Sequence, residues 1–322
     1  MHYFFYTIQY ILSRGQHPHR LSQGLTPRLI SFMKIGSFQK NVLLANQTSF
    51  KIGGPAKYFF EAKTKQDVVE SLKIAGEDNL PFFILGGGSN VLAQDKGFDG
   101  LVLKTCNSQF SIDGLKIKAE AGAPLAGLTA ASAGVSLTGF EWAVGIPGRV
   151  GGSLCGNSKA FNKNISDFVK EVEILDLKDF KIKTLTKEDC NFSEKESVFK
   201  HNKNLIILSA VFQLKKSSKE KIKKKIKENI VFRKEKQPLN YPSAGSVFVN
   251  LSGQKPSSYL IEKAGLKGRR VGGAQISEKH AGFIINLGEA KSADVLTLIE
   301  IVKKEVRKKF RINLKEEIQI IK

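Results

Sequence analysis

Short apolar runs and longer amphipathic segments alternate along the first two thirds of the chain, which predicts a mixture of strands and helices. Strands bounded by glycine, proline or polar turn residues are expected at 57–61, 81–85, 101–104, 115–120, 171–177 and 205–214. Helices are expected at 66–75, where apolar residues recur along one face, and at 125–134, a run of small residues. Because these elements fall into two groups, we predict two α/β units, 33–104 and 105–215.

A lysine-rich amphipathic segment separates these units from the last third of the chain. It begins near residue 216, places isoleucines four residues apart on one face, and is closed by Pro238. The elements predicted beyond it are strands at 246–249, 282–286 and 316–321 and helices at 257–264 and 291–309. We therefore expect one domain at 33–215, made of the two α/β units, and a C-terminal domain at 216–322.

The first 32 residues have a different pattern. Residues 2–12 are apolar and aromatic, but no basic region precedes them and no small-residue cleavage site follows, so they make a poor signal peptide. Met33 is the other methionine of the chain, and a more ordinary sequence begins there. We expect Met33 to be the native start and 1–32 to be an upstream extension without a packed role. No apolar run approaches the roughly 18 residues of a membrane span, so none is expected.

Three cysteines indicate the compartment. Cys106, Cys155 and Cys190 lie far apart with no CxxC spacing, which gives neither a disulfide framework nor a zinc site. No metal is expected, and the cysteine pattern fits a reducing compartment such as the cytoplasm.

The charge of the chain changes the range of partners. A formal net charge of +21 attracts phosphates, whether of nucleic acid, anionic lipid or a dinucleotide. Eleven of the 51 basic residues lie at 215–236, where Phe232 is the one aromatic residue. Nucleic-acid binding would favour more aromatic residues among the lysines. We therefore interpret this segment as a helix with a solvated lysine face and keep a basic nucleic-acid-binding protein as a remote alternative.

Two glycine-rich loops are the first candidate binding feature. GGGSN at 86–90 follows an apolar strand directly, so its backbone amides can face an anion without intervening side chains. GIPGRVGGS at 145–153 is a second such turn, and Asn157 follows it. Neither loop is a GxGxxG that opens a helix, so a Rossmann fingerprint is not supported. We predict that one dinucleotide lies across both loops.

Ser246, in YPSAGSVFVN at 241–250, is the first candidate catalytic residue. Pro242 and Gly245 restrict the backbone around it, and a hydroxyl at the mouth of a short strand can donate a proton. From the residues alone, the favoured interpretation is an ordinary turn serine that satisfies a backbone group.

Five motifs together carry a family resemblance. They are IGGPA (52–56), ILGGGSN (84–90), GIPGRVGG (145–152), PSAGSVF (242–248) and AGLKGRRVGGAQISEKHAGFIIN (264–286). From about Gln47 to the C-terminus, the chain resembles the MurB-type UDP-N-acetylenolpyruvoylglucosamine reductases of peptidoglycan precursor synthesis. The SEKHAGF block resembles the shorter form, which lacks an extra tyrosine-bearing loop. The resemblance implies an α+β fold, with a two-part FAD-binding domain of the vanillyl-alcohol-oxidase (PCMH) type followed by a smaller α+β substrate-binding domain.

The resemblance also implies a reaction, that of a UDP-N-acetylmuramate dehydrogenase. NADPH would reduce FAD, and UDP-N-acetylglucosamine enolpyruvate would then take a hydride from flavin N5 at C3. A proton from Ser246 would reach C2, while Glu317, near the C-terminus, would polarise the substrate carboxylate. The expected partners are NADPH and the UDP-sugar, with no obligatory nucleic acid, in a cytoplasmic monomer or weak oligomer.

One catalytic position departs from the family pattern. CNFSEKESVFK at 190–200 aligns without a gap with a family stretch resembling CxFGYRxSxFK, and Lys195 stands where the family has its arginine. Lysine keeps the positive charge but lacks the planar fork that grips a carboxylate with two bonds. Two interpretations stay open: an adjusted reductase, or a divergent FAD-linked oxidoreductase of the same fold with altered or lost chemistry.

The remaining site residues follow from the motifs. The implied cofactor contacts, in and near the two loops, are Gly53, Gly54, Gly86, Gly87, Gly88, Ser89, Asn90, Gly145, Ile146, Gly148, Gly151, Gly152, Ser153, Asn157 and Arg233. Asn250 and His280 are implied substrate contacts. Val249 replaces a family lysine, and Arg149 replaces a smaller threonine for a reason that the sequence does not supply.

Overall fold

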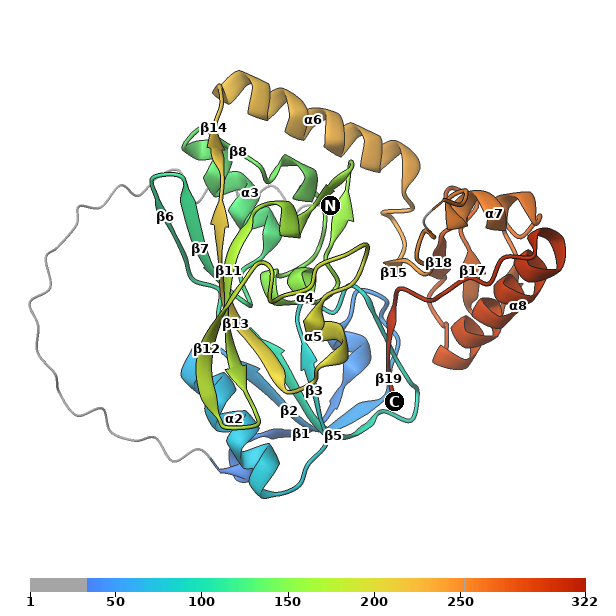
Figure 1. Cartoon of the computed structure of the whole chain (residues 1–322). Coiled ribbons are helices and arrows are strands. Elements are labelled where there is room, and N and C mark those ends of the chain that lie inside the picture. The colour runs from blue at the N-terminus through green and yellow to red at the C-terminus, as the bar shows by residue number, and fades with distance from the viewer. Residues whose placement is uncertain (1–33, 252) are drawn as a thin grey trace, which may run out of the picture. The chain divides into compact units, whose positions relative to one another are not determined.

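The computed structural model describes residues 34–251 and 253–322, so the predicted extension at 1–32 and the predicted start at Met33 lie outside the described residues (Figure 1). The first part of the described chain contains a four-stranded sheet in the order β1-β2-β5-β3. Its strands are β1 (Gln39–Leu43), β2 (Pro55–Ala62), β5 (Phe98–Thr105) and β3 (Phe82–Leu85). β2, β5 and β3 run parallel, so their carboxyl ends meet at one edge, where the glycine-rich loop at 86–90 begins.

Helix α2 (Lys65–Glu77) covers this sheet and begins where the sequence predicts a helix start. Thr64 and Asp67 form a capping box, in which each side chain accepts a hydrogen bond from the other residue's backbone amide. The apolar face of α2 buries Val68 and Leu72 in one core cluster with Leu103 of β5.

The second part is built on an antiparallel sheet in the order β12-β11-β13-β7-β6. Its strands are β12 (Lys181–Thr186), β11 (Val169–Asp176), β13 (Leu205–Gln213), β7 (Lys116–Glu120) and β6 (Phe110–Asp113). Helices α3 (Leu125–Gly134) and α4 (Val150–Cys155) share a core with this sheet, in which the Phe140 and Phe212 rings meet edge to face at 5.3 Å.

The lysine-rich helix α6 (Lys219–Lys236) packs on this second part. Asn229 Nδ2 donates to the carbonyl of Glu141 (2.8 Å), and Arg233 Nη2 donates to that of Trp142 (3.4 Å), both in the 3-10 helix η3 (Glu141–Ala143). The predicted C-terminal domain begins at 216, before α6, whereas these contacts join α6 to the preceding part. We therefore propose a boundary after α6, near residue 237.

The third part contains a sheet in the order β15-β18-β17-β16, covered by two helices (Figure 1). The elements are β15 (Ser243–Ser246), α7 (Ser257–Lys263), β16 (Arg270–Val271), β17 (Ala274–Ile276), β18 (Phe283–Asn286) and α8 (Ser292–Phe310). The predicted strand at 246–249 is displaced, because the observed strand ends at Ser246. The cause is local: Gly245 has a φ of 75°, and the pairing with β18 shifts register between Ser243 and Ser246.

The end of the chain leaves the third part and returns to the first. Val249 N donates to Lys315 O (2.9 Å) and Glu317 N donates to Val247 O (2.7 Å), which pairs the segment 315–317 with the residues after Ser246. Strand β19 (Gln319–Ile321) then pairs in parallel with β4 (Val91–Ala93), directly after the first glycine-rich loop. Of the predicted strand at 316–321, only these last three residues form β19.

The described residues also contain several short helices and two-residue strands: η1 (Ile35–Ser37), η2 (Leu44–Gln47), β8 (Leu137–Thr138), β9 (Lys159–Ala160), β10 (Lys163–Asn164), η4 (Ile165–Asp167), α5 (Val198–His201) and β14 (Lys215–Lys216). Among the helices of residues 34–251 and 253–322, none combines the length and apolar character needed to cross a bilayer.

Candidate active site

One large cavity lies among the three parts, with a volume of about 1120 Å³. Most of the residues that the sequence assigns to a site line it, and they come from all three parts. They are Gly86, Gly87, Gly88, Ser89, Asn90, Gly145, Ile146, Gly148, Gly151, Gly152, Ser153, Lys195, Arg233, Ser246 and Glu317. Residues more than 200 positions apart in the sequence therefore line the same cavity.

The two glycine-rich loops lie against each other at this cavity. A Cβ atom added at Gly87 would lie 2.7 Å from the carbonyl oxygen of Pro147, so a side chain there would push the loops apart. Glycine is required for this approach, which leaves backbone rather than side chains on the cavity wall. Such a surface suits an extended anionic group such as a diphosphate.

Arg233 supplies a buried positive charge beside the second loop. Its side chain lies over the Phe161 ring, 5.3 Å from the centroid, and the residue is 8% exposed. Burial lowers the pKa of Arg233, and its Nε atom is buried without a hydrogen-bond partner among the described residues. A buried guanidinium that keeps an unused donor fits an anionic group at this wall of the cavity.

Arg149 adds a second guanidinium and gives the replacement of threonine a physical role. Its Nη1 donates to the carbonyls of Gly122 (2.7 Å) and Thr105 (3.2 Å), and its side chain lines the cavity beside Gly87. The residue thus ties the second loop to the end of β5 and places a cation beside the glycine-rich surface. Together, the loops, Arg233 and Arg149 fit the diphosphate of FAD.

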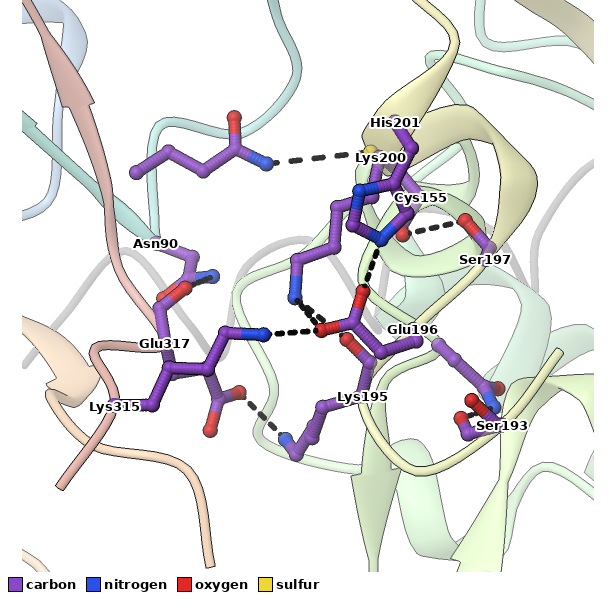
Figure 2. A network of polar contacts seen from close by, with 12 residues as sticks. Asn90, Cys155, Ser193, Lys195, Glu196, Ser197, Lys200, His201, Lys315 and Glu317 are labelled. Atoms are coloured by element: carbon purple, nitrogen blue, oxygen red, sulfur yellow. Dashed lines mark hydrogen bonds and ion pairs between the residues drawn. The ribbon is translucent and has the colours of Figure 1, made fainter. Parts of the chain in front are cut away.

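Lys195 and Glu317 form an ion pair at another wall of the cavity (Figure 2). Lys195 Nζ lies 2.6 Å from Glu317 Oε1, and the two side chains are 18% and 16% exposed. The neighbouring Glu316 instead binds Lys303 (3.0 Å), as expected if side chains alternate along an extended segment. The two residues predicted to polarise a carboxylate therefore contact each other, although they are 122 positions apart.

Ser246 reaches the same cavity at the end of β15. The amide of the next residue, Val247, donates to Gly282 O (2.9 Å), and the carbonyl of Val247 accepts from Glu317 N (2.7 Å). On the other side, Ser49 Oγ donates to Ser243 O (2.7 Å). Hydrogen bonds to the backbone of Ser243 and Val247 thus hold the segment that carries Ser246, and one of them comes from the residue that binds Lys195.

Three predicted cofactor contacts lie away from the cavity lining. Gly53 and Gly54 accept backbone hydrogen bonds from Ala45 (3.2 Å) and Leu44 (3.0 Å), which hold η2 against the chain. Asn157 is 2% exposed, and its Nδ2 donates to the carbonyl of Ser193 (2.7 Å) in the turn that carries Lys195. The structure gives these residues roles in folding the loops.

The two predicted substrate contacts also bind the protein itself. Asn250 Oδ1 accepts from the amide (2.9 Å) and the hydroxyl (3.0 Å) of Ser257, the first residue of α7. His280 Nδ1 accepts from the amide of Gly282 (3.1 Å), its ring packs on Phe283, and burial lowers its pKa. Neither residue belongs to the cavity lining.

Several cavity residues were not predicted from the sequence. The polar and cationic ones among them include Ser49, Arg149, Lys159, Lys200, Lys203 and Gln319. Lys200 could have been found, because it is the final residue of the stretch that aligns with CxFGYRxSxFK. Arg149 lies inside the second glycine-rich motif, where it replaces a threonine, and the other four stand outside the recognised motifs, so only the fold brings those four to the cavity.

Comparisons with known proteins agree with this arrangement. The domain family described as UDP-N-acetylenolpyruvoylglucosamine reductase, C-terminal domain, matches residues 237–321, and the family described as FAD binding domain matches residues 56–186. The chain is 41% identical to a UDP-N-acetylenolpyruvoylglucosamine reductase of Caldanaerobacter subterraneus subsp. tengcongensis, over 94% of this chain and 99% of the relative. It is 44% identical to a protein of the same name from Caldicellulosiruptor bescii, over 88% of this chain and 90% of the relative.

A solved structure matches the fold as well. The crystal structure of UDP-N-acetylenolpyruvylglucosamine reductase from Thermus caldophilus is similar to this chain with a TM-score of 0.76 and 30% sequence identity. The match covers 88% of this chain and 100% of that chain.

Proposed function

The chain belongs to the UDP-N-acetylenolpyruvoylglucosamine reductase family, and from this premise we propose that Ser246, Lys195 and Glu317 complete the reduction of UDP-N-acetylglucosamine enolpyruvate to UDP-N-acetylmuramate. FAD, when bound, supplies the hydride chemistry, taking a hydride from NADPH and giving it to C3 of the enolpyruvyl group. The observation that carries the proposal is that these three side chains line one cavity with both glycine-rich loops.

Lys195 and Glu317 act on the substrate carboxylate in this proposal. Hydride addition at C3 leaves negative charge at C2, which spreads into the adjacent carboxylate. The Lys195 ammonium has three N–H donors, of which Glu317 takes one and leaves two for the substrate. A cation held in a partly buried site stabilises the developing charge more than a mobile cation in water does.

Ser246 supplies the proton to C2. A serine hydroxyl is a weak acid, so it can donate only to a strong base such as a carbanion or enolate held within hydrogen-bond distance. The hydrogen bonds to the backbone of Ser243 and Val247 hold the segment that carries Ser246, and the one from Glu317 N joins it directly to the segment that carries Glu317. Proton donation and charge stabilisation are thus supplied by segments that are directly hydrogen-bonded to each other.

The cofactor and the setting follow from other residues. The loops at 86–90 and 145–153, with Arg233 and Arg149, would hold the FAD diphosphate. The proposed substrates are both nucleotides, and the three cysteines are free, which is typical of a reducing compartment, so we propose a cytoplasmic enzyme. A monomer or weak oligomer stays a prediction.

The divergent oxidoreductase with lost chemistry is the less favoured candidate. Its basis is the replacement of arginine by Lys195, yet Lys195 retains the charge and a direct contact with Glu317. A loss of chemistry would remove the requirement for this partly buried pair.

Turnover by the purified full chain tests the proposed function. The flavin released on denaturation should be FAD, and NADPH oxidation should require UDP-N-acetylglucosamine enolpyruvate. Mass spectrometry should detect a product heavier by two hydrogen atoms. NADPH consumption at the same rate with and without this substrate, and without such a product, would reject the proposal.

A further inference from the structure

The turn that carries Lys195 has an uncommon backbone conformation. Ser193 and Glu196 exchange two backbone hydrogen bonds, of 3.1 and 3.2 Å, which close a tight hairpin. Within it, Lys195 has a φ of 59°, in the left-handed region that residues other than glycine rarely adopt. Neighbouring groups must therefore hold this conformation.

Lys200, in the short helix α5, is one of those groups. Its Nζ donates to the backbone carbonyl of Lys195 (2.7 Å) and to Glu196 Oε1 (3.2 Å). A single ammonium thus binds the backbone of the catalytic lysine and the side chain of the next residue.

The Glu196 carboxylate is the centre of a wider network (Figure 2). Besides Lys200, it binds Lys315 Nζ (3.1 Å) and His201 Nε2 (2.7 Å). Burial works to raise the pKa of Glu196, but the hydrogen bonds from His201, Lys315 and Lys200 lower it to about 2. The carboxylate is therefore charged at every pH at which the enzyme would work.

The contacts between the turn and the C-terminal segment form a reciprocal pattern. The turn supplies a cation and then an anion, Lys195 and Glu196, while the segment supplies a cation and an anion two residues apart, Lys315 and Glu317. Alternation along the extended segment puts these last two side chains on one face. Two ion pairs of opposite polarity thus join the turn to the segment.

We propose that Glu196 is a positioning residue, which acts with Lys200 and Lys315 to hold the Lys195 turn against the segment that carries Glu317. The inference rests on the proposed function, since it concerns how Lys195 does the work of an arginine. A lysine side chain has no planar fork to fix its orientation, so the direction of its ammonium depends on how firmly its backbone is held. Glu196, Lys200 and Lys315 supply that restraint without being reacting groups themselves.

Glu196→Gln in the FAD-loaded full chain tests this role, because it removes the charge and keeps the shape. In anaerobic stopped-flow experiments, flavin reduction by NADPH should stay within about twofold of wild type. Reoxidation of the reduced flavin by UDP-N-acetylglucosamine enolpyruvate should slow by about 10- to 100-fold, the loss typical of a misplaced catalytic group. Glu196→Asp should recover part of that rate.

A matched control separates positioning from general destabilisation. Glu173, which pairs with Lys65, has the same side-chain exposure as Glu196, 24%, and lies outside the cavity lining. Glu173→Gln should leave both half-reactions unchanged. Lys315→Met tests the same contact from a side chain that is 63% exposed, so folding should tolerate it. The Glu196→Gln/Lys315→Met double variant should be slowed less than the product of the two single effects.

Two results would overturn the inference. One is reoxidation of Glu196→Gln and Lys315→Met at the wild-type rate, and the other is an equal slowing of both half-reactions. A different result bears on the proposed function: if NADPH reduces the flavin of the wild-type enzyme but the enolpyruvyl substrate never reoxidises it, that function is rejected, and the inference with it.

Discussion

Lys195 is the proposed catalytic residue that departs from the family pattern. Its ammonium makes one contact with Glu317, where an arginine could offer a planar pair of donors. The charge needed beside the substrate carboxylate is present, but its direction depends on the surrounding turn.

We expect Lys195→Arg to keep turnover and to raise it if the fork can reach the substrate carboxylate. Lys195→Met should lower the rate of flavin reoxidation by about 10²- to 10³-fold, the range seen when one donor that stabilises a developing charge is removed. Lys65→Met is the control: it removes a partly buried lysine from the Lys65–Glu173 ion pair, which lies outside the cavity lining, and should not change that rate. A Lys195→Met variant as fast as wild type would show that Lys195 has no catalytic role.

Among single residues, position in a motif predicted which ones line the cavity better than residue type did. Ser246, Lys195 and Glu317 stand in aligned motifs, and the structure places all three at the cavity. Asn157, which follows a motif, and His280, which lies inside one, are not in the cavity lining: backbone groups bind both polar atoms of the Asn157 side chain and Nδ1 of His280. The sequence shows which groups can form hydrogen bonds, but the partner is decided only when distant segments meet.

Strand β19 is the element that brings Glu317 to the cavity. It pairs with β4 right after the first glycine-rich loop, and Asn90 Nδ2 also donates to the carbonyl of Glu317 (3.2 Å). Ile321, which is 1% exposed, anchors the strand in a core with Leu44 and Phe59. The position of the Glu317 carboxylate therefore depends on the packing of the chain's last residues.

Ile321→Ala should lower the free energy of unfolding by roughly 2–5 kcal/mol, as in other large-to-small core substitutions. Because it loosens the segment that carries Glu317, it should also slow flavin reoxidation more than flavin reduction at a temperature where the protein is folded. Ile174→Ala, at an equally buried position of β11, is the control for stability alone. If the ratio of the reoxidation rate to the reduction rate is the same in Ile321→Ala and Ile174→Ala, the position of β19 does not affect catalysis.

Long periodic elements could be predicted from the sequence, and most elements of two or three residues could not. Helix α8 (Ser292–Phe310) lies within a residue of its predicted range because its apolar residues repeat over several turns. Strands β4 and β9 have three and two residues, too few to show a period. The strand expected at 246–249 was displaced because the pattern does not reveal the irregular pairing around Gly245.

The molecule as a whole follows the order that the family resemblance implied. The comparisons confirm an FAD-binding domain followed by the C-terminal domain of the reductase family. The return of the chain to β4 was not predicted, since a parallel pairing between residues 91–93 and 319–321 leaves no local signal. That return places the Glu317 carboxylate of the last segment in the cavity that the first two parts line.

The two halves of the reaction should respond separately to changes in this assembly. In the proposed reaction, cofactor reduction by NADPH would need the loops and the bound FAD, whereas substrate reduction would also need Ser246, Lys195 and Glu317. The central claim is that Ser246 donates the proton at C2 of the substrate.

Anaerobic stopped-flow measurement of both half-reactions in Ser246→Ala tests that claim most directly. Flavin reduction by NADPH should remain within about twofold of wild type, while reoxidation by UDP-N-acetylglucosamine enolpyruvate should slow by about 10²- to 10⁴-fold, the contribution of a general acid. Reoxidation of the variant at the wild-type rate, or the same loss in both half-reactions, would contradict the account.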